Sequence, residues 1–304
     1  MGRQRSHIHA AALIVLALIV ATGSASALRV PGAAACPVFP RSNPWNRPID
    51  SLPVAPNSRK LIRSMGASTG LHADFGSGTW DGGPIGIPFN VVSNRTPRPK
   101  LTFDYADESD NGPYPIPHGL KLEYGGDRHA LMIDRSSCKL YEVYDLHGRH
   151  AGSGAIWSLR SNRLRPAGWT SADAAGLAIL PGLARWDEVA RGRIDHALRF
   201  TVGHTRRAYV YPARHYASDS SDRSLPPMGL RVRLRADYPI ASFPGQARIV
   251  LRGLKRYGMI LADNGGDWYV SGAPSPHWNN DALHTLDRVK GSAFEVVDTS
   301  SLAP

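Results

Sequence analysis

Two short segments of the chain have the residue pattern of β-strands, one continuously apolar and one alternating between apolar and polar positions. A polar turn separates them. Ala130–Asp134 is apolar and ends on an acid, whereas residues 140–144 alternate and are rich in aromatic and β-branched types. Such residues favour the pleated, half-buried surface of a sheet. Residues 135–137 are an arginine and two serines, which are typical of a tight turn. The pattern predicts a β-hairpin.

The register of this hairpin decides which polar side chains meet. If Asp134 pairs with Lys139, then His129 and Glu142 lie on the same face, because side chains alternate across a strand. A histidine and a glutamate one diagonal apart can act as an acid–base pair, and they can equally form a structural hydrogen bond. At the level of sequence both interpretations stay open.

Short strands dominate the remaining pattern, and a single segment has a clear helical period. In residues 247–257 the apolar positions Ile249, Val250, Leu254 and Tyr257 recur at helical spacing. The pattern also predicts short helices over residues 59–65, 183–191 and 281–289, and strands over residues 89–92, 100–105, 156–159, 194–202, 208–211, 230–234, 259–262, 268–271 and 294–297.

The expected strands do not alternate with helices, so a doubly wound parallel sheet is not expected. The Asn-Gly pair at residues 264–265 predicts a hairpin between the strands that flank it. We therefore predict a mainly β fold, with a twisted sandwich or jelly-roll-like body and a few peripheral helices. An α+β fold is the alternative.

Proline content divides the chain before this body begins. Residues 28–56 hold seven prolines and are expected to form an extended arm rather than a helix. Residues 57–304 are expected to form a single β-rich domain, within which residues 245–304 make a small α+β subregion.

The first residues resemble a secretory signal peptide, residues 1–27. Arg3 and Arg5 precede an apolar run over residues 10–21, and Ala25-Ser26-Ala27 fits a cleavage site. The run is too short to span a bilayer comfortably. We expect a secreted, extracellular protein that is monomeric and leaves the membrane after cleavage.

The cysteine count agrees with that compartment. Cys36 and Cys138 are the only two cysteines, and a pair in an exported chain predicts one disulfide. This bond would tie the arm to the hairpin.

The positive net charge of the chain adds little information about its binding partners. The formal net charge is +11, but the arginines are spread along the chain and match no nucleic-acid-binding motif. The basic surface either keeps the protein soluble or attracts an acidic polymer. We expect no nucleic-acid partner.

Candidate chemistry rests on carboxylates and histidines, because no serine-hydrolase elbow or zinc-protease motif is present. Residues 104–110 hold four acids, and crowded like charges raise a pKa or attract a cation. A solvated acidic turn explains the same tract. The candidate catalytic residues are Glu142, His129, Asp107, Glu108, Asp110, Asp173 and His196, and the candidate substrate-binding residues are Trp80, Trp169, Arg214 and His215. We predict no metal ligands and no cofactor.

A strand return at residues 208–211 would place His196 near Arg214 and His215. Two histidines without a metal-binding motif are a weak metal signal, and structural histidines explain them better.

Exported β proteins that carry acids and tryptophans on one face commonly act on polysaccharides, which is an argument by fold analogy. Glycoside hydrolysis needs two carboxyl groups across a groove. A lyase needs a base and an arginine to neutralise a uronate. We expect a secreted carbohydrate-active enzyme, a glycoside hydrolase or polysaccharide lyase, whose partner is a polysaccharide or cell-wall glycan. The alternatives are a non-catalytic glycan or cell-wall binding module and a structural metalloprotein.

Four segments add a resemblance. WTSADAAGL, DHALRFTV, RYGMILADNGG and DESDNGPYPIP resemble a family of exported bacterial proteins, and the likeness covers most of residues 37–300. The resemblance implies a single continuous domain. It implies no activity and transfers no catalytic residue.

Overall fold

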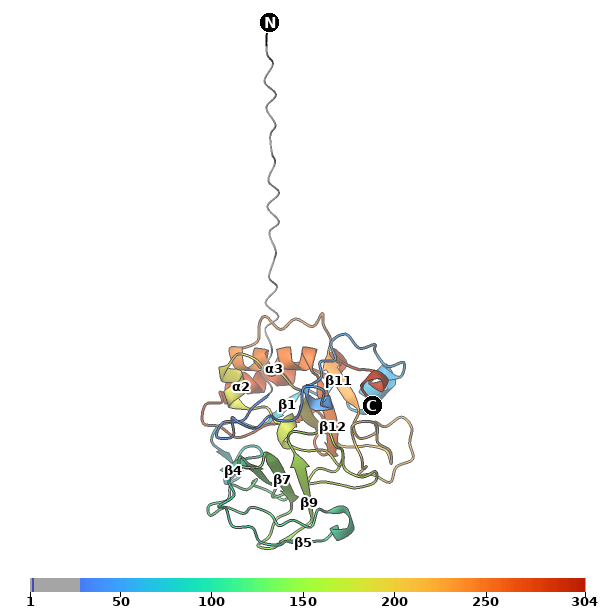
Figure 1. The fold of residues 1–304 in the computed structure, drawn as a ribbon. Coiled ribbons are helices and arrows are strands. Elements are labelled where there is room, and N and C mark those ends of the chain that lie inside the picture. The colour runs from blue at the N-terminus through green and yellow to red at the C-terminus, as the bar shows by residue number, and fades with distance from the viewer. Residues whose placement is uncertain (1, 3–27, 304) are drawn as a thin grey trace.

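Two sheets form the body of the protein in the computed structural model, which describes residue 2 and residues 28–303 (Figure 1). The predicted signal peptide, residues 1–27, lies outside the described residues except for Gly2. The larger sheet has six strands in the order β1–β13–β10–β12–β11–β14. Its strands are β1 (His72–Asp74), β13 (Tyr269–Ser271), β10 (Leu198–Val202), β12 (Met259–Asn264), β11 (Arg231–Leu234) and β14 (Phe294–Val296).

The smaller sheet has four strands in the order β4–β6–β7–β9. It consists of β4 (Phe89–Val92), β6 (Ala130–Asp134), β7 (Lys139–Tyr144) and β9 (Ser153–Ser158), and two further pairs are β2 (Thr79–Trp80) with β3 (Gly83–Pro84) and β5 (Thr102–Phe103) with β8 (His150–Ala151). The strands pair in parallel as well as antiparallel. The mainly β or α+β class is confirmed, and a jelly roll is not.

Helices are short and lie at the periphery. Figure 1 shows α2 and α3 on the side of the larger sheet that faces away from the smaller one. The predicted helix over 247–257 is confirmed as α3, which starts two residues earlier and buries Val250, Leu251 and Leu254. The helices are α1 (Ser58–Ser64), α2 (Trp186–Ala190), α3 (Gly245–Arg256) and α4 (Asn280–His284), with 3-10 turns η1 (Pro44–Asn46), η2 (Ala106–Glu108), η3 (Leu180–Gly182), η4 (Thr285–Arg288), η5 (Gly291–Ala293) and η6 (Ser300–Leu302).

The predicted hairpin at the turn of residues 135–137 is confirmed, including its register. Asp134 pairs with Lys139 and Leu131 pairs with Glu142. The register follows from burial, because one face of β6 and β7 packs on the main core while the other packs on a separate cluster under residues 101–122. A slip by one residue would exchange the two faces.

The predicted hairpin around residues 264–265 is wrong. β12 and β13 both exist, but β10 lies between them and pairs with each. All five residues of β10 are buried, so its backbone needs hydrogen-bonding neighbours on both edges. For the same reason residues 208–211 find no free edge on β10, and Tyr209 forms only a single bridge, to Met228.

The arm is pinned to the body as expected. Cys36 and Cys138 form the predicted disulfide, with their Cα atoms 5.2 Å apart. Trp45 is 3% exposed and Ile49 is fully buried. Such a bond is typical of an oxidising environment outside the cytosol. Among the helices of the described residues, none has the length and apolar character needed to cross a bilayer.

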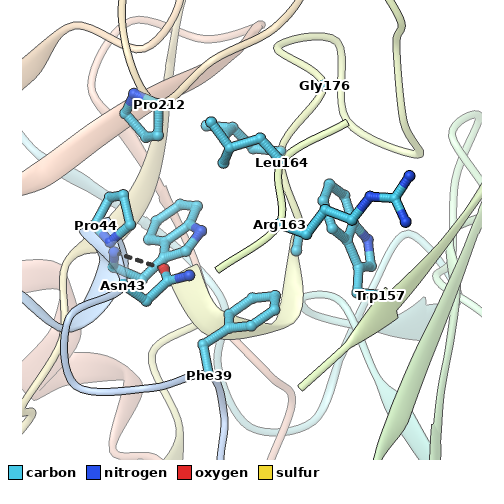
Figure 2. Close-up of a pocket in the computed structure, with 11 residues that line it drawn as sticks. Phe39, Asn43, Pro44, Trp157, Arg163, Leu164, Gly176 and Pro212 are labelled. Atoms are coloured by element: carbon cyan, nitrogen blue, oxygen red, sulfur yellow. Dashed lines mark hydrogen bonds between the residues drawn. The ribbon is translucent and has the colours of Figure 1, made fainter. Parts of the chain in front are cut away.

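A small cavity lies where the arm meets the body (Figure 2). Asn43, Pro44 and Phe39 of the arm surround it together with Trp157 of β9, and Asn43 Oδ1 accepts a hydrogen bond from the Trp45 amide at 3.1 Å. Its volume of about 20 Å³ has room for roughly one water molecule. This cavity is therefore a packing feature of the arm and too small for a substrate.

Candidate active site between the two sheets

A polar cavity with a volume of about 450 Å³ is lined by residues from both sheets. Asp263 and Asn264 at the end of β12 contribute from the larger sheet, and Tyr144 at the end of β7 contributes from the smaller one. Glu108 and Asp127 complete the set of lining carboxylates. Three acids thus line one cavity of a size suited to a small ligand or a segment of polymer.

A β-bulge decides that Asp263 reaches this cavity. Phe200 pairs with Leu261, but the next residue, Thr201, pairs with Asp263 because Ala262 is skipped. Regular pairing would place Ala262 beside Thr201 and turn Asp263 to the helix-covered face. The extra residue therefore re-aims the carboxylate toward the smaller sheet.

Arg199 organises the acids beneath the cavity. Its guanidinium donates to both carboxylate oxygens of the fully buried Asp173, at 3.0 and 2.8 Å, and to Asp263 Oδ2 at 3.1 Å. It also donates to Ser271 Oγ at 2.7 Å. The forked guanidinium matches the bidentate geometry of Asp173. One cation therefore serves two carboxylates.

This shared cation leaves Asp263 partly uncompensated. Burial raises its pKa and the charge of Asp173 raises it further, while Arg199 acts in the opposite direction, so that the pKa reaches about 7. The Asp263 side chain is nevertheless 23% exposed and lines the cavity. A carboxyl group with a raised pKa and access to a cavity has the properties expected of a general acid.

His129 carries a second ion pair at the edge of the same cavity. Its Nδ1 contacts Glu123 Oε2, and its Nε2 faces the carbonyl of Ala172 at 2.9 Å. Both ring nitrogens face acceptors, which suits the doubly protonated imidazolium. Burial lowers the pKa of His129, but Glu123 outweighs it and the pKa rises to about 9.

Asp127 lies beside this ion pair. One carboxylate oxygen of Asp127, one of Glu123 and one nitrogen of His129 all lie within 4.8 Å of one another. Because both nitrogens of His129 already have acceptors, a metal ion would have to break one of these contacts. The group is better described as a hydrogen-bonded pair with Asp127, an exposed acid, next to it.

Glu142 and His129 share a face of the hairpin, as the register predicts, but they do not form a pair. Glu142 is fully buried, and its carboxylate accepts from the amides of Ile179 and Leu180 at the start of η3, at 2.9 to 3.0 Å. Burial raises its pKa to about 7 against these hydrogen bonds. Glu142 does not line the cavity and has a structural contact instead.

The acidic tract is divided among separate partners. Asp107 is exposed, whereas Glu108 lines the cavity, where its Oε2 accepts from the amide of Thr170 at 2.8 Å. Asp110 accepts from Arg165 at 2.7 Å and from the amide of Ile156 at 2.8 Å. Of the three candidate acids in this tract, only Glu108 therefore lines the cavity.

His196 lies elsewhere, in a sealed cluster. Its Nε2 is 3.0 Å from Glu188 Oε2 and its Nδ1 is 2.7 Å from the carbonyl of Ala197. The expected neighbourhood of His196, Arg214 and His215 is wrong, because the segment that carries Arg214 and His215 bonds to Ala174 and Ala175. The free edge that the expected pairing needs does not exist on β10.

The candidate substrate-binding residues divide in the same way. His215 lines the cavity, 3.8 Å from Glu108, and Trp80 is 74% exposed on the β2–β3 hairpin. Trp169 lies against the guanidinium of Arg165, and Arg214 donates to the carbonyl of Arg165 at 3.0 Å. Neither Trp169 nor Arg214 lines this cavity, and Trp169 lines a separate one beside Arg165.

Three residues of the site are not predicted from the sequence. Asp263 is part of an apparent turn, Asp127 belongs to a Gly-rich loop, and Arg199 sits among apolar strand residues. Only Arg199 carries a usable signal, because an arginine inside an apolar strand needs a buried acid. The other two depend on the bulge and on the loop conformation.

Comparison of the chain with family models, with curated proteins and with solved structures finds no significant match. The resemblance to exported bacterial proteins stays a prediction. The argument for function therefore rests on the geometry of the site.

Proposed function

We propose that the chain is a secreted carbohydrate-active enzyme that cleaves a polysaccharide by acid–base chemistry. The observation that carries the proposal is Asp263, a carboxyl group with a pKa near 7 that shares a cavity with Asp127 and Glu108. Paired carboxyl groups with different proton affinities are the working parts of glycoside hydrolysis.

In this mechanism Asp263 donates its proton to the glycosidic oxygen as the bond to carbon breaks. Asp127 is the partner carboxylate, which either takes a proton from the attacking water or attacks the sugar itself. Arg199, which is itself fixed by Asp173, holds Asp263 in place, and burial together with the negative charge of Asp173 favours the protonated form of Asp263.

A hydrolase is favoured over a lyase. A lyase acting on uronates needs free cations beside the substrate carboxylate. In this cavity the lining ionisable groups are Glu108, Asp127, Asp263, His215 and two tyrosines, and Arg199 is already engaged by two acids. The buried titratable network supports an enzyme over a binding module, for which a shallow aromatic surface is expected.

The test is incubation with a panel of plant, fungal and bacterial cell-wall polysaccharides, followed by assays for new reducing ends and for unsaturated products. We expect reducing ends without unsaturation, and a fall of about 10²–10⁴ in rate for Asp263→Asn. Asp107→Asn is the matched control, because Asp107 is exposed outside the cavity. Unsaturated products would identify a lyase, and binding without any cleavage would identify a binding module.

A further inference from the structure

A second cavity, of about 330 Å³, lies beside the first along the larger sheet. His72 and Asp74 of β1 and Tyr269 of β13 line it, together with Trp80 of the β2–β3 hairpin and His284 of α4. The proposed catalytic chemistry uses none of these residues.

The sheet connects the two cavities. Asp263 pairs with Thr201, Thr201 pairs with Tyr269, and Tyr269 pairs with His72. Paired residues point to the same face, so these side chains form one row across β12, β10, β13 and β1. Three strand spacings amount to ~14 Å. That length exceeds one sugar ring and suits a short stretch of polymer.

Acids continue along this row. Asp74 pairs with Ser271, whose Oγ accepts from Arg199. Protein packed around Asp74 raises its pKa, and so does the charge of Glu123, although the Asp74 side chain still contacts solvent. The carboxylates of both cavities thus belong to one electrostatic neighbourhood.

Exposed aromatic side chains border the same groove. Four large aromatic residues are exposed within residues 28–303, namely Trp80 (74%), Tyr105 (54%), Tyr124 (51%) and Tyr269 (37%). Tyr105 lines the first cavity, and Trp80 and Tyr269 line the second. Tyr269 stacks on His72 with ring centroids 4.0 Å apart, which fixes its plane. Exposed aromatic rings collected along a groove mark a binding surface.

The hairpin that presents Trp80 is held from both sides. Gly83, the partner of Trp80, lies so close to Tyr124 that a Cβ there would come within 1.9 Å of Tyr124 Cγ. Asn280 of α4 accepts from the amide of Ser77 at 2.9 Å and donates to its carbonyl at 3.0 Å. Trp80 is therefore displayed on a supported element.

The acidic residues beside the two cavities disfavour a negatively charged ligand. The chain as a whole carries a net charge of +11, yet Asp74, Glu123, Asp127 and Asp263 gather along this groove. An anionic polymer would meet like charges here, whereas an uncharged or amino-bearing chain would not.

We propose that the second cavity is a distal subsite of the same groove, in which Trp80 and Tyr269 bind sugar rings of a glycan chain that carries no negative charge. The enzyme then cleaves inside chains rather than at their ends. Cleavage inside chains rests on the proposed function, whereas the binding of sugar rings by Trp80 and Tyr269 does not.

The test measures binding of hexasaccharides by calorimetry to the full chain carrying Asp263→Asn, a variant expected to slow turnover. The probes are the hexamers of cellulose, xylan, mannan, laminarin and glucosamine, with the galacturonic acid hexamer as the anionic comparison. We expect one or more of the first five to bind at least tenfold tighter than the galacturonate, and Trp80→Ala to weaken that binding about tenfold or more. Trp80→Phe keeps a ring and is expected to retain most of the affinity. Val210→Ala, at an exposed position that lines neither cavity, is the control.

Equal binding by Trp80→Ala and Val210→Ala, tighter binding of the galacturonate, or no binding by any of the first five hexamers would overturn the proposal. Hexamer binding that depends on Trp80 without cleavage by the wild type would support the subsite and refute the proposed function. Cleavage with release of single sugars only would refute the assignment of cutting inside chains.

Discussion

Two buried clusters of histidine, carboxylate and arginine side chains within residues 28–303 differ in how their charges are paired. In the groove cluster, Arg199 serves two acids, Asp173 and Asp263. In the core cluster, Glu188 faces both Arg185, at 2.9 Å, and His196, at 3.0 Å, while Arg185 also contacts Asp187 at 3.2 Å. One arginine is thus shared by two acids around Arg199, whereas one acid, Glu188, is shared by two cations.

The consequences for protonation are opposite. Burial raises the pKa of Glu188, but Arg185 and His196 outweigh it and hold the pKa below its usual range. The pKa of Asp263 rises to about 7 because burial and Asp173 outweigh Arg199. Glu188 thus stays ionised, whereas Asp263 can exchange a proton near neutral pH.

The two clusters also differ in access to solvent. Arg185, Glu188 and His196 are at most 1% exposed, whereas the Asp263 side chain is 23% exposed into a cavity. Residue types in contact do not by themselves define a site. The sharing of Arg199 by two acids and an opening to solvent distinguish the groove cluster from the core cluster.

The largest effect on stability is expected in the core cluster. Glu188→Gln removes the negative charge that faces Arg185 and His196, and breaking a buried pair costs about 3–5 kcal/mol of unfolding free energy. Urea unfolding measures the loss. Activity per folded molecule should be unchanged.

Glu295→Gln is the control for this variant, since Glu295 pairs with Arg233 near the surface and its loss should cost less than about 1 kcal/mol. Equal losses for the two variants would show that the core cluster is not held by its charges.

A smaller change in the free energy of unfolding, this time a gain in stability at high pH, is expected for Asp263→Asn. A carboxyl group whose folded pKa lies above its unfolded value loses stability as pH rises between the two values. The wild type should therefore lose stability from about pH 4 to pH 7, and the variant should lose less. At pH 8 we expect the variant to be more stable by about 1–3 kcal/mol, since each pH unit contributes about 1.4 kcal/mol and the lost contact with Arg199 offsets part of the gain.

Thermal unfolding at pH 5 and pH 8 measures this difference between Asp263→Asn and the wild type. A variant that is less stable than the wild type at both pH values would contradict a strained, uncompensated Asp263.

The smallest of the three expected effects is the change in kcat/KM with pH. If Asp263 is the general acid, kcat/KM should fall as pH rises through about 7, approaching tenfold per pH unit at higher pH. Rate measurements between pH 5 and pH 9 on the most active polysaccharide of the panel test this. A rate that stays level from pH 6 to pH 9 would exclude Asp263 as the acid, and Asp173 would then be only a structural partner of Arg199.

Much of the local structure is predictable from sequence. The hairpin of β6 and β7 follows from alternation and turn residues, and its register follows from burial of one face on the main core. The longest helix, α3, follows from its apolar spacing. These elements depend on neighbours close in the chain.

Long-range pairing is less predictable. The Asn-Gly turn favours a direct hairpin between β12 and β13, but β10, fully buried, gains hydrogen bonds on both edges by inserting between them. Local turn preference is weaker than the need to pair a buried backbone. The candidate site suffers from the same limit, since Glu142 and His196 are drawn into structural contacts that sequence cannot foresee.

The β-rich class, the disulfide between Cys36 and Cys138, and the hairpin with its shared face can all be predicted from the amino-acid sequence. These follow from periodicity and cysteine count, which are local or compositional. The tertiary fold is needed to explain why Asp263, rather than Glu142, lines a cavity, and why the pKa of Asp263 is raised. That outcome depends on one skipped residue in β12 and on two acids sharing Arg199, and both arise only when strands far apart in the chain are brought together.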